Sequence, residues 1–506
     1  MPFTGDFEVE RKFDVGETTQ LPPFHQLPLV DRVEQSVEYH LDATYFDTAD
    51  YALAARRMTL RRRTGGEDAG WHLKMPVSSD ERREIREPLA VDPNIVPQSF
   101  LLLLRVHVRD RVLIPVARLR TQRIVHRLRD MHGEVLADFC DDRVEAQRLG
   151  PDPANLIWRE WELELADGST TLLDAAESML AIADVLPSAY PSKLARVLGD
   201  KYPEKEPPAP WGLSRKCPSA NVLLVYLNEQ VQVLTEQDPR LRAGSPDSVH
   251  LMRIATRRLR SSLSTYRILL DADLATGLRA ELKWLGSILG THRDAQVMHQ
   301  RLTELIAAEP TELIQGPMLR RVDEQLESDL RNARLTALEA LDDERYFHLL
   351  DGLDALLAAP PLTDLASVPE QKIVPELVKT EWKRLRQAVR TAVRTPVGVG
   401  HDQALHEVRK SAKRLRYAAE TATPLHRKRA TRIADAAERI QTILGDHQDS
   451  VLAQGLLRHL GMEAHLQGEN VFSYGRLNAL EQRTAESSEI QFRQAWKRFP
   501  SVSLKK

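Results

Sequence analysis

The fold of this chain is decided by FEVERKF at residues 7–13, which predicts one strand with two unlike faces. Strand side chains alternate between the two faces, so Glu8, Glu10 and Lys12 share one face while the phenylalanines and the valine share the other. The apolar face indicates contact with a core. A charged face on a single strand is most often simply solvated, so this stretch alone does not define a site.

A second acidic strand, WREWELEL at residues 158–165, argues against simple solvation. Glu160, Glu162 and Glu164 again share one face, so the two strands together carry five carboxylates. Same-face neighbours on a strand are about 6.6 Å apart, close enough for two carboxylates to share a divalent cation. Hard oxygen ligands of this kind suit Mg²⁺ or Mn²⁺.

Residues 1 to about 200 contain eight short segments rich in Val, Tyr, Phe and Thr, which predict strands. These segments lie near residues 7–13, 37–46, 58–64, 70–75, 82–89, 111–127, 134–146 and 158–166. Two helices are expected around residues 24–34 and 171–185. If the eight strands close into a barrel, the first and last become neighbours, and a polar interior makes the barrel a tunnel.

The middle strands carry the opposite charge from the terminal strands. Their basic residues are Arg61 and Arg63, His72 and Lys74, and Arg118, Arg120 and Arg123. Two opposite charges about 4 Å apart attract by about 1 kcal/mol in bulk water but by about 4 kcal/mol at an effective dielectric of roughly 20. A confined tunnel lined by several cations therefore favours a densely charged anion, such as a chain of phosphates, over a single phosphate.

The glutamates and the lysine of residues 8–12 resemble the ExExK signature of the CYTH superfamily of triphosphate tunnel metalloenzymes. Further elements of that family match in order, namely YFDT at residues 45–48, LRRR at 60–63, WHLK at 71–74, the acidic strand at 158–165 and SK at 192–193. The resemblance covers residues 1 to about 200. It implies an eight-stranded antiparallel tunnel barrel that hydrolyses or transfers at a triphosphate and depends on Mg²⁺ or Mn²⁺.

The resemblance also implies roles for individual residues of the tunnel. The implied metal ligands are Glu8, Glu10, Glu160, Glu162 and Glu164. The implied substrate ligands are Lys12, Arg61, Arg63, Lys74, Arg118, Arg120, Arg123 and Lys193, with Arg196 as a further candidate. The implied catalytic residues, which position the metal and an attacking water, are Glu8, Glu10, Lys12, Glu160 and Glu162. The family usually places an acid pair in the strand at residues 135–143, where Asp138, Asp141 and Asp142 are all candidates and Asp138 is preferred as a metal ligand.

The second part of the chain is separated by a proline-rich stretch. KYPEKEPPAPWGLSRKCP predicts a linker at residues 201–219, because proline neither continues a helix nor donates to a sheet. The linker divides a domain at residues 1–200 from a second domain at residues 220–500. In this second domain apolar residues recur every three or four positions, which is typical of long helices.

The helical part contains an internal repeat. HLMRIATRRLRS at residues 250–261 is similar to HEVRKSAKRLRY at 406–417. LGSILGTHRD at residues 285–294 is similar to IQTILGDHQD at 440–449, at nearly the same offset. Two matched blocks at one spacing predict an all-α domain made of two repeated helical bundles.

One face of each repeated block is basic. At about 100° per residue, the residues on these two stripes are His250, Arg253, Arg257 and Arg260, and His406, Arg409, Lys413 and Arg416. The blocks resemble the CHAD domain, a histidine-rich helical domain often fused to CYTH domains and associated with inorganic polyphosphate. The resemblance covers about residues 220–500 and implies polyphosphate contacts at the eight stripe residues. His292 and His447 are either ligands or buried histidines with satisfied hydrogen bonds, and both interpretations stay open.

Composition limits the other classes of function. The 506 residues carry 70 Lys and Arg against 73 Asp and Glu, so no bulk charge favours nucleic acid or a membrane surface. The two cysteines, Cys140 and Cys217, fit neither a disulfide scaffold nor a zinc site. No apolar segment near the N-terminus reads as a signal peptide, and a cytoplasmic location is expected.

The combined pattern predicts a metal-dependent hydrolase of inorganic triphosphate, with polyphosphate bound by the C-terminal domain. No P-loop, GxSxG or HExxH motif suggests a different chemistry. One alternative is a non-catalytic protein that binds or targets polyphosphate. Another is a triphosphatase or cyclase that acts on an organic triphosphate, such as a nucleoside or thiamine triphosphate. The sequence leaves the oligomeric state open.

Overall fold

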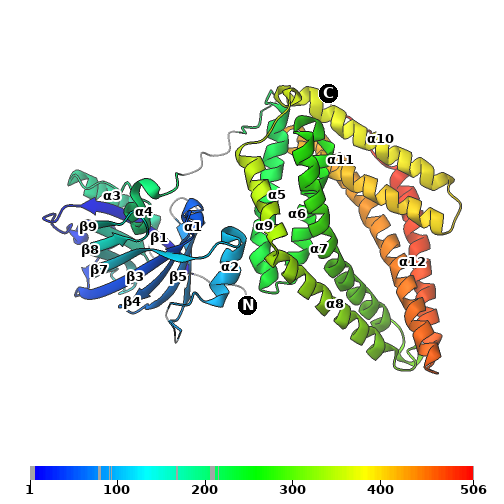
Figure 1. Cartoon of the computed structure of the whole chain (residues 1–506), viewed down its shortest axis with the longest axis horizontal. Coiled ribbons are helices and arrows are strands. Elements are labelled where there is room, and N and C mark those ends of the chain that lie inside the picture. The colour runs from blue at the N-terminus through cyan, green and yellow to red at the C-terminus, as the bar shows by residue number, and fades with distance from the viewer. Residues whose placement is uncertain are drawn as a thin grey trace. The chain divides into compact units, whose positions relative to one another are not determined.

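The computed structural model describes residues 6–77, 81–90, 92, 94–166, 169–204, 211–214 and 216–504. The chain divides into two compact units, Met1–Pro207 and Pro208–Lys506, the first built on a β-sheet and the second on helices (Figure 1). Part of the predicted linker, residues 205–210 and 215, lies outside the described residues.

The first unit contains a closed antiparallel barrel. Its strands are β1 (Asp6–Val15), β2 (Arg32–Val33), β3 (Val37–Asp47), β4 (Thr59–Thr64), β5 (Gly70–Pro76), β6 (Glu81–Glu87), β7 (Ile114–Arg129), β8 (Val135–Arg148) and β9 (Ala154–Leu165). Hydrogen bonding runs in the order β7-β3-β4-β5-β6-β1-β9-β8, and β8 pairs with β7 to close the ring. The short β2 pairs with β7 beside β3. The predicted eight-stranded antiparallel barrel is confirmed.

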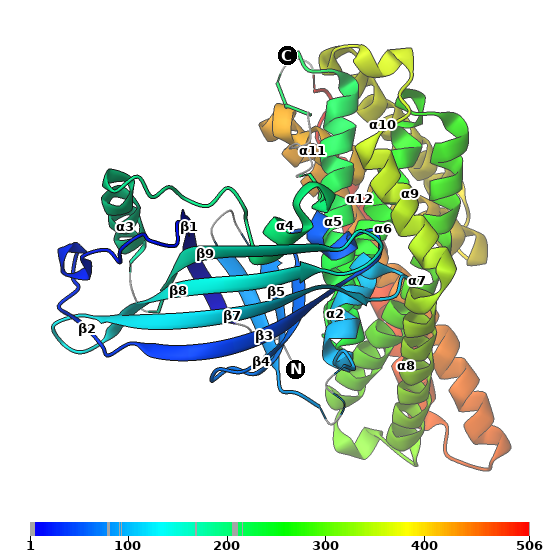
Figure 2. The same cartoon turned by 60° about the vertical axis from the view of Figure 1, so that its left-hand side comes forward.

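The two acidic strands are neighbours, as the closed barrel requires. β1 lies between β6 and β9, and Glu10 is opposite Glu164 while Lys12 is opposite Glu162. β9 in turn pairs with β8 along most of its length, and β7, β8 and β9 run side by side in Figure 2. The carboxylates at the two ends of the barrel sequence therefore come together on one wall.

The apolar faces of several strands point out of the barrel and are covered by helices. Outside β1 and β9, Phe13 and Trp161 pack against α3 (Thr170–Ile182). Outside β4 and β5, Leu60 and Trp71 pack against α2 (Gln98–Val108). Because alternate side chains point the other way, the same strands turn their charged residues into the lumen.

One end of the lumen is filled by apolar side chains. Leu119 of β7 and Val144 of β8 point inward and pack against Leu194 and Leu198 of α4 (Lys193–Leu198). Ser192 caps the N-terminus of α4 by accepting a hydrogen bond from the Ala195 backbone at 3.1 Å. The charged part of the lumen therefore lies next to a packed apolar plug that includes α4.

The predicted helices of the first unit are partly right. The helix expected at residues 171–185 is present as α3, but the helix expected at 24–34 is wrong, because that stretch forms only the 3₁₀ turn η1 (Phe24–Gln26) and β2. Prolines at positions 22, 23 and 28 remove backbone donors there, and Leu29 adopts φ 67°. The helices α1 (Ala52–Ala55), α2 and α4 were not predicted.

The second unit is all helical, as predicted. Its helices are α5 (Ser219–Arg242), α6 (Ser248–Thr265), α7 (Ala272–Ala307), α8 (Met318–Asp342), α9 (Glu344–Ala358), α10 (Glu370–Arg394), α11 (Val399–Leu466) and α12 (Phe472–Lys497). The remaining 3₁₀ turns are η2 (Gly199–Lys201), η3 (Arg267–Leu269), η4 (Thr311–Leu313) and η5 (Asp364–Ser367). No helix in the described part of the chain has an apolar stretch long enough to span a bilayer.

The internal repeat is visible in the order of these helices. α11 is kinked at His426, where φ is −118° and ψ is 31°, two residues after Pro424. Its two halves carry the sequence blocks that α6 and α7 carry in the first repeat. Pro218 and Pro369, which precede α5 and α10, pair in an antiparallel bridge. The two repeats thus start from equivalent, mutually hydrogen-bonded positions.

Candidate active site

A pocket in the charged part of the lumen is lined almost entirely by ionisable side chains. Its lining residues are Glu8, Glu10, Lys12, Tyr45, Thr59, Arg61, Arg63, Asp68, Lys74, Arg82, Glu84, Arg86, Arg123, Glu162, Glu164, Ser192 and Lys193. Barrel strands supply most of them, and the start of α4 supplies the last two. Residues from opposite ends of the domain therefore share one small space.

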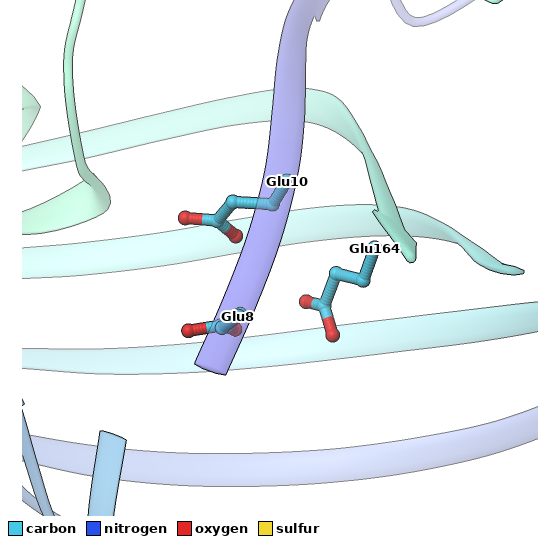
Figure 3. A group of neighbouring side chains, drawn as sticks. All are labelled: Glu8, Glu10 and Glu164. Atoms are coloured by element: carbon cyan, nitrogen blue, oxygen red, sulfur yellow. The ribbon is translucent and has the colours of Figure 1, made fainter. Parts of the chain in front are cut away.

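Three lining carboxylates form a first cluster, which we call the outer carboxylates: Glu8, Glu10 and Glu164. One oxygen of each lies within 4.8 Å of the others, a spacing that a single metal ion can bridge. Figure 3 shows Glu8 and Glu10 projecting from β1 toward the same space as Glu164 of β9. The strand alternation that places Glu8 and Glu10 on one face, and the register that sets Glu10 beside Glu164, produce this arrangement.

Each outer carboxylate has a different cation beside it: Lys74 lies 2.6 Å from Glu8, Lys12 lies 2.8 Å from Glu10 and Arg123 lies 3.4 Å from Glu164. Burial raises the pKa of Glu10, but Lys12 and Lys74 outweigh it and bring the pKa to about 2. Burial also raises the pKa of Glu164, and the charges of Glu162, Glu8 and Glu10 raise it further against the opposing Arg123. A divalent cation among these oxygens would relieve that repulsion, so the donor set fits Mg²⁺ or Mn²⁺.

Replacing Glu164 with glutamine is expected to stabilise the metal-free barrel at neutral pH and to weaken Mn²⁺ binding at least about tenfold. Because the folded pKa of Glu164 lies above the ordinary 4.5, its contribution to stability is favourable at low pH and is lost as the pH rises through the folded pKa. Denaturant unfolding at pH 5 and pH 8, with and without Mn²⁺, measures both effects. Glu145→Gln, at an exposed position of β8, is the control, and unchanged Mn²⁺ affinity in the Glu164 variant would contradict the assignment.

Three further carboxylates, which we call the inner carboxylates, are Asp142, Glu160 and Glu162, and they also lie within 4.8 Å of one another. They already surround a cation, because the Lys193 ammonium lies 2.9, 2.6 and 2.7 Å from them respectively. Arg123 adds a bidentate contact to Asp142, at 2.8 and 2.7 Å, and also bonds Glu162. Lys193 is therefore shared by all three inner carboxylates, whereas no cation of the described residues contacts all three outer ones.

Lys12 joins the two carboxylate clusters. Its ammonium donates to Glu10 at 2.8 Å and to Glu162. Burial lowers the pKa of Lys12, but the two glutamates more than compensate and keep it above the usual range. Lys12 is therefore a charged donor between the clusters at neutral pH.

The opposite wall of the pocket is crowded with cations. Burial, Arg61 and Arg123 together lower the pKa of Arg63 to about 9, although its guanidinium pairs with Asp68 and Glu84 lies nearby. Lys74 is held by Glu8 at 2.6 Å and lies 3.8 Å from Glu84. This wall can bind several oxygens of an anion, and the anion would in turn relieve the repulsion among the cations.

Buried Glu84 of β6 organises this basic wall. It accepts hydrogen bonds from His72 at 3.0 Å and Arg86 at 2.7 Å, and Arg61 lies 3.8 Å away. Burial lowers the pKa of His72 to about 4, although its two ring nitrogens face two acceptors, Glu84 at 3.0 Å and the Asp68 carbonyl at 2.9 Å. Glu84 was missed in the sequence, although the alternation of charged residues in ERREIRE gave the signal.

Most of the residues proposed from the sequence do lie together in the pocket. These residues are Glu8, Glu10, Lys12, Arg61, Arg63, Lys74, Arg123, Glu162, Glu164 and Lys193. Glu160 lies beside them among the inner carboxylates. Tyr45, Thr59, Asp68, Arg82, Glu84 and Arg86 also line the pocket and were not proposed as site residues.

The expected placement of Arg118 and Arg120 in the lumen is wrong. Both lie on the outer face of β7, where they pair with Asp42 at 2.6 and 3.7 Å and are 48% and 64% exposed. Arg123 is an odd number of residues away from both, so strand alternation turns it inward and turns the other two outward. Counting along ARLRTQR was enough to separate them.

The preference for Asp138 as a metal ligand is not supported by its placement. Arg127 holds Asp138 at 2.9 and 3.1 Å, and it belongs to neither carboxylate cluster. Asp141 points to the other face and pairs with Arg159 at 2.8 Å. Of the three candidates, the structure brings Asp142 alone into the inner carboxylates.

A separate basic cluster, which we call the central cations, lies in the helical unit. It consists of Arg253 and Arg257 of α6 and Arg409 and Lys413 of α11, which lie close enough to perturb one another's charges. Burial, Arg409, Arg257 and Arg253 together lower the pKa of Lys413 to about 6. The two predicted stripes therefore face each other.

The repeated glycines make room for the repeated arginines. A Cβ at Gly445 would lie 2.9 Å from a guanidinium nitrogen of Arg409, and a Cβ at Gly290 would lie 3.8 Å from Arg253. The buried Nε atoms of Arg257 and Arg409 have no hydrogen-bond partner among the described residues. Packed arginines with unused donors are suited to an anionic ligand.

The other stripe residues have mixed surroundings. Burial first, and then neighbouring cations, lower the pKa values of His250 and His406, and His406 contacts Gln448 at 3.1 Å. Arg260 lies near Arg257, whereas Arg416 is already paired with Glu420 and Glu438 at 2.6 and 2.9 Å. Arg416 is thus the predicted contact least available to an anion.

The two repeated histidines are both mostly buried. Burial lowers the pKa of His292, and its Nδ1 has no partner among the described residues. Burial also lowers the pKa of His447, which lies 3.6 Å from Asp402. Neither histidine belongs to a group of metal-binding geometry in the described part of the chain, so the structure assigns no ligand to them.

Comparison with known proteins agrees with both halves of this description. The chain matches the CYTH domain over residues 6–198 and the CHAD domain over residues 225–458. Two Mycobacterium tuberculosis proteins, "Uncharacterized protein MT2285" of strain CDC 1551 / Oshkosh and "Uncharacterized protein Rv2226" of strain ATCC 25618 / H37Rv, are each 38% identical over 98% of this chain and 97% of their own.

Two solved structures are similar at lower identity. PptA from Streptomyces chartreusis is 24% identical with a TM-score of 0.47, over 55% of this chain and 99% of that chain. The CHAD domain from the plant Ricinus communis is 23% identical with a TM-score of 0.46, over 58% of this chain and 96% of that chain.

The chain belongs to the family of proteins that join a CYTH domain to a CHAD domain. CYTH domains act on triphosphates as triphosphatases or cyclases and depend on a metal, so the barrel unit is a triphosphate-acting enzyme in general. Among the described residues, the outer and the inner carboxylates are the two acidic groups whose spacing could hold a metal ion.

Proposed function

We propose that the barrel unit hydrolyses inorganic triphosphate with Mg²⁺ or Mn²⁺. The observation that carries the proposal is the lining of the pocket, in which Tyr45 is the sole aromatic residue and every other described lining residue is charged or a small hydroxyl. A nucleobase or a thiazolium ring needs an apolar or aromatic surface to pack against. Such a surface is missing from the described lining, which favours a substrate made of phosphate alone.

The residues of the pocket would have different roles in hydrolysis. A bound divalent cation supplies charge neutralisation at phosphate oxygens and would be held by Glu8, Glu10 and Glu164. Arg61, Arg63, Lys74 and Arg123 bind the remaining oxygens and stabilise charge on the leaving phosphates. Lys12 holds the carboxylates of Glu10 and Glu162 in place, and these orient a water for in-line attack on the terminal phosphorus.

A substrate panel tests the proposed reaction. Purified full-length protein is assayed for phosphate release from tripolyphosphate, pyrophosphate, ATP, thiamine triphosphate and long-chain polyphosphate, each with Mg²⁺ and with Mn²⁺. We expect tripolyphosphate to give the highest kcat/KM. A higher kcat/KM for ATP or thiamine triphosphate would favour an organic triphosphate instead, and no turnover of any substrate would favour a non-catalytic binding protein.

We also propose that the helical unit binds inorganic polyphosphate at the central cations. Residues 208–506 carry 43 Lys and Arg against 37 Asp and Glu, whereas residues 1–207 carry 27 against 36, so the two units have opposite net charge. Burial first, and then the charges of Arg409, Arg257 and Arg253, lower the pKa of Lys413 to about 6, although Asp294 opposes them. A polyanion held here would raise the local concentration of phosphate chains around the enzyme.

Replacing Arg257 and Arg409 together with glutamine is expected to weaken polyphosphate binding at least about 100-fold. Two charge-assisted hydrogen bonds would be lost, each worth roughly 1.5–3 kcal/mol. The same change should raise the free energy of unfolding of the ligand-free helical unit, because it removes repulsion between buried cations. Titration calorimetry with long-chain polyphosphate measures the first effect and denaturant unfolding the second. Binding equal to that of the unmodified protein would exclude the central cations as the site.

A further inference from the structure

A second row of cations runs along α10, on the side away from the helical core. Its members are Lys379, Lys383, Arg386, Arg390 and Arg394, and we call them the α10 stripe. Steps of four, three, four and four residues place all five on one face of a helix, over about 22 Å. All five side chains are exposed, and α10 borders the helical unit in Figure 1.

The α10 stripe lies nearly opposite the buried face of the same helix. Val374, Val378, Leu385 and Val389 form that buried face and pack into the unit. The central cations lie on α6 and α11 instead, so the stripe is a different surface of the molecule. The stripe therefore needs an explanation of its own.

The charges of the α10 stripe are almost uncompensated. Lys379 lies 3.7 Å from Glu376, but Lys383, Arg386, Arg390 and Arg394 have no ion-pair partner among the described residues. Four like charges at three- and four-residue steps repel one another and destabilise an isolated helix by a few tenths of a kcal/mol per pair. The stripe therefore does not stabilise α10, and stability gives no reason for its presence.

The internal repeat shows that the fold does not require the stripe. Pro218 and Pro369 mark equivalent starts of α5 and α10. At the same distances from its proline, the first repeat carries only uncharged residues: Asn228, Gln232, Thr235 and Pro239 in α5, and Ala243 directly after it. The same helix position is therefore built without a single cation in the first repeat, so the stripe is a property of this second copy alone.

We infer that the α10 stripe is a second binding track for long inorganic polyphosphate, outside the central cations. This inference rests on the proposed function of the helical unit and extends it. Glu376 is the one acid of α10 on the face of the stripe, since Glu381 is buried, and such a row of cations matches a linear chain that presents charge at every unit. Chains long enough to reach both surfaces would then bind more tightly than chains that fill the central site alone.

Two other polyanionic partners fit the surface less well. Trp382 is the aromatic residue of α10, but its ring stacks on Phe499 at 4.9 Å and contacts Trp496 at 5.3 Å, so these rings cover one another instead of offering faces to unpaired bases. A membrane-surface helix inserts Leu, Phe or Trp below its basic residues. The apolar face of α10 is already buried in the protein, and Val393 is the exposed apolar residue next to the stripe.

The test uses the full chain with the triple substitution Lys383→Gln, Arg386→Gln and Arg390→Gln. We expect the affinity for long-chain polyphosphate to fall about tenfold, as expected for three exposed charge contacts. The slope of log affinity against log salt should fall by about 2, since each lost phosphate contact removes roughly 0.7. Binding and hydrolysis of tripolyphosphate should not change, because this short substrate is handled by the barrel unit and does not use the α10 stripe.

A matched control removes the same charge elsewhere. Arg320→Gln, Arg458→Gln and Arg483→Gln alter three exposed cations of α8, α11 and α12, and should leave long-chain affinity within about twofold of the unmodified protein. Equal long-chain affinity in the stripe variant and the unmodified protein would overturn the inference while leaving the proposed central site intact. Loss of binding to duplex DNA or to phosphatidylglycerol vesicles, with polyphosphate affinity retained, would overturn it in favour of that partner. Whether the central cations bind polyphosphate is measured separately, with the variant in which Arg257 and Arg409 are replaced by glutamine.

Discussion

Glu10→Gln is expected to reduce metal-dependent release of phosphate from tripolyphosphate by about 1,000-fold or more. The substitution keeps the shape of the side chain but removes one of the three charges of the outer carboxylates. It also leaves Lys12 with one carboxylate partner, Glu162, in place of two. Steady-state assays across a range of Mg²⁺ and Mn²⁺ concentrations measure the loss and show whether excess metal restores part of the rate.

A control for this prediction lies on the outside of the same barrel. Asp42→Asn removes a carboxylate that pairs with Arg118 and Arg120 on the outer face, so hydrolysis should stay near the unmodified rate. Long-chain polyphosphate binding should survive in the Glu10 variant, because the central cations belong to the other unit. Hydrolysis within tenfold of the unmodified protein would show that the metal is held elsewhere.

Lys193→Met is expected to lower the free energy of unfolding of the barrel unit by roughly 3–5 kcal/mol. The ammonium lies among three buried carboxylates, and methionine fills the same volume without the charge. Arg123 still contacts two of the carboxylates, but Glu160 loses its closest cation. Denaturant unfolding followed by tryptophan fluorescence, with the transitions of the two units separated, measures the change.

Divalent metal makes the Lys193 experiment more specific. The three vacated carboxylates lie within 4.8 Å of one another, so Mg²⁺ or Mn²⁺ should recover part of the lost stability in the variant. Lys201→Met, at a residue that is 45% exposed and 3.7 Å from Asp152, should change stability by less than about 1 kcal/mol. A Lys193 variant as stable as the unmodified protein would show that the inner carboxylates are not held together by this ammonium.

Strand alternation accounts for what the sequence could predict of the pocket. Glu8, Glu10 and Lys12 are two residues apart, and so are Glu160, Glu162 and Glu164, so their faces follow from counting alone. The eight segments and the charge pattern allowed a closed barrel and the CYTH resemblance implied one, which the pairing of β7 with β8 confirms. Arg118 and Arg120, by contrast, were placed in the lumen with the other basic residues of the middle strands without that count.

Register and local chain direction account for what the sequence could not predict. Asp138 and Asp142 share a face of β8, and the choice between them depends on which lies level with Glu160 and Glu162. That register is set by pairing with a strand far away in sequence. The stretch at residues 24–34 has helical composition in part, but Pro28 within it, Pro22 and Pro23 just before it and the left-handed Leu29 override that tendency.

The division of the carboxylates into two clusters could also not be predicted from the sequence. Five glutamates on two strands suggested one metal site, whereas Lys193 enters from α4 and occupies the centre of one cluster. In the helical unit the periodicity gave the two stripes, and the repeated glycines that make room for Arg253 and Arg409 became intelligible only in three dimensions.

The position of β1 bears on how the protein is made. Among the barrel strands β1 is synthesised first, and it pairs with β6 and, about 150 residues later in the chain, with β9. Until that late strand is released, one edge of the nascent sheet stays open and exposes backbone groups that invite pairing with other chains. Closure of the barrel therefore waits for the pairing of β1 with β9. A fusion that holds β1 away from β9 would leave the barrel open between these two strands, where the outer carboxylates meet.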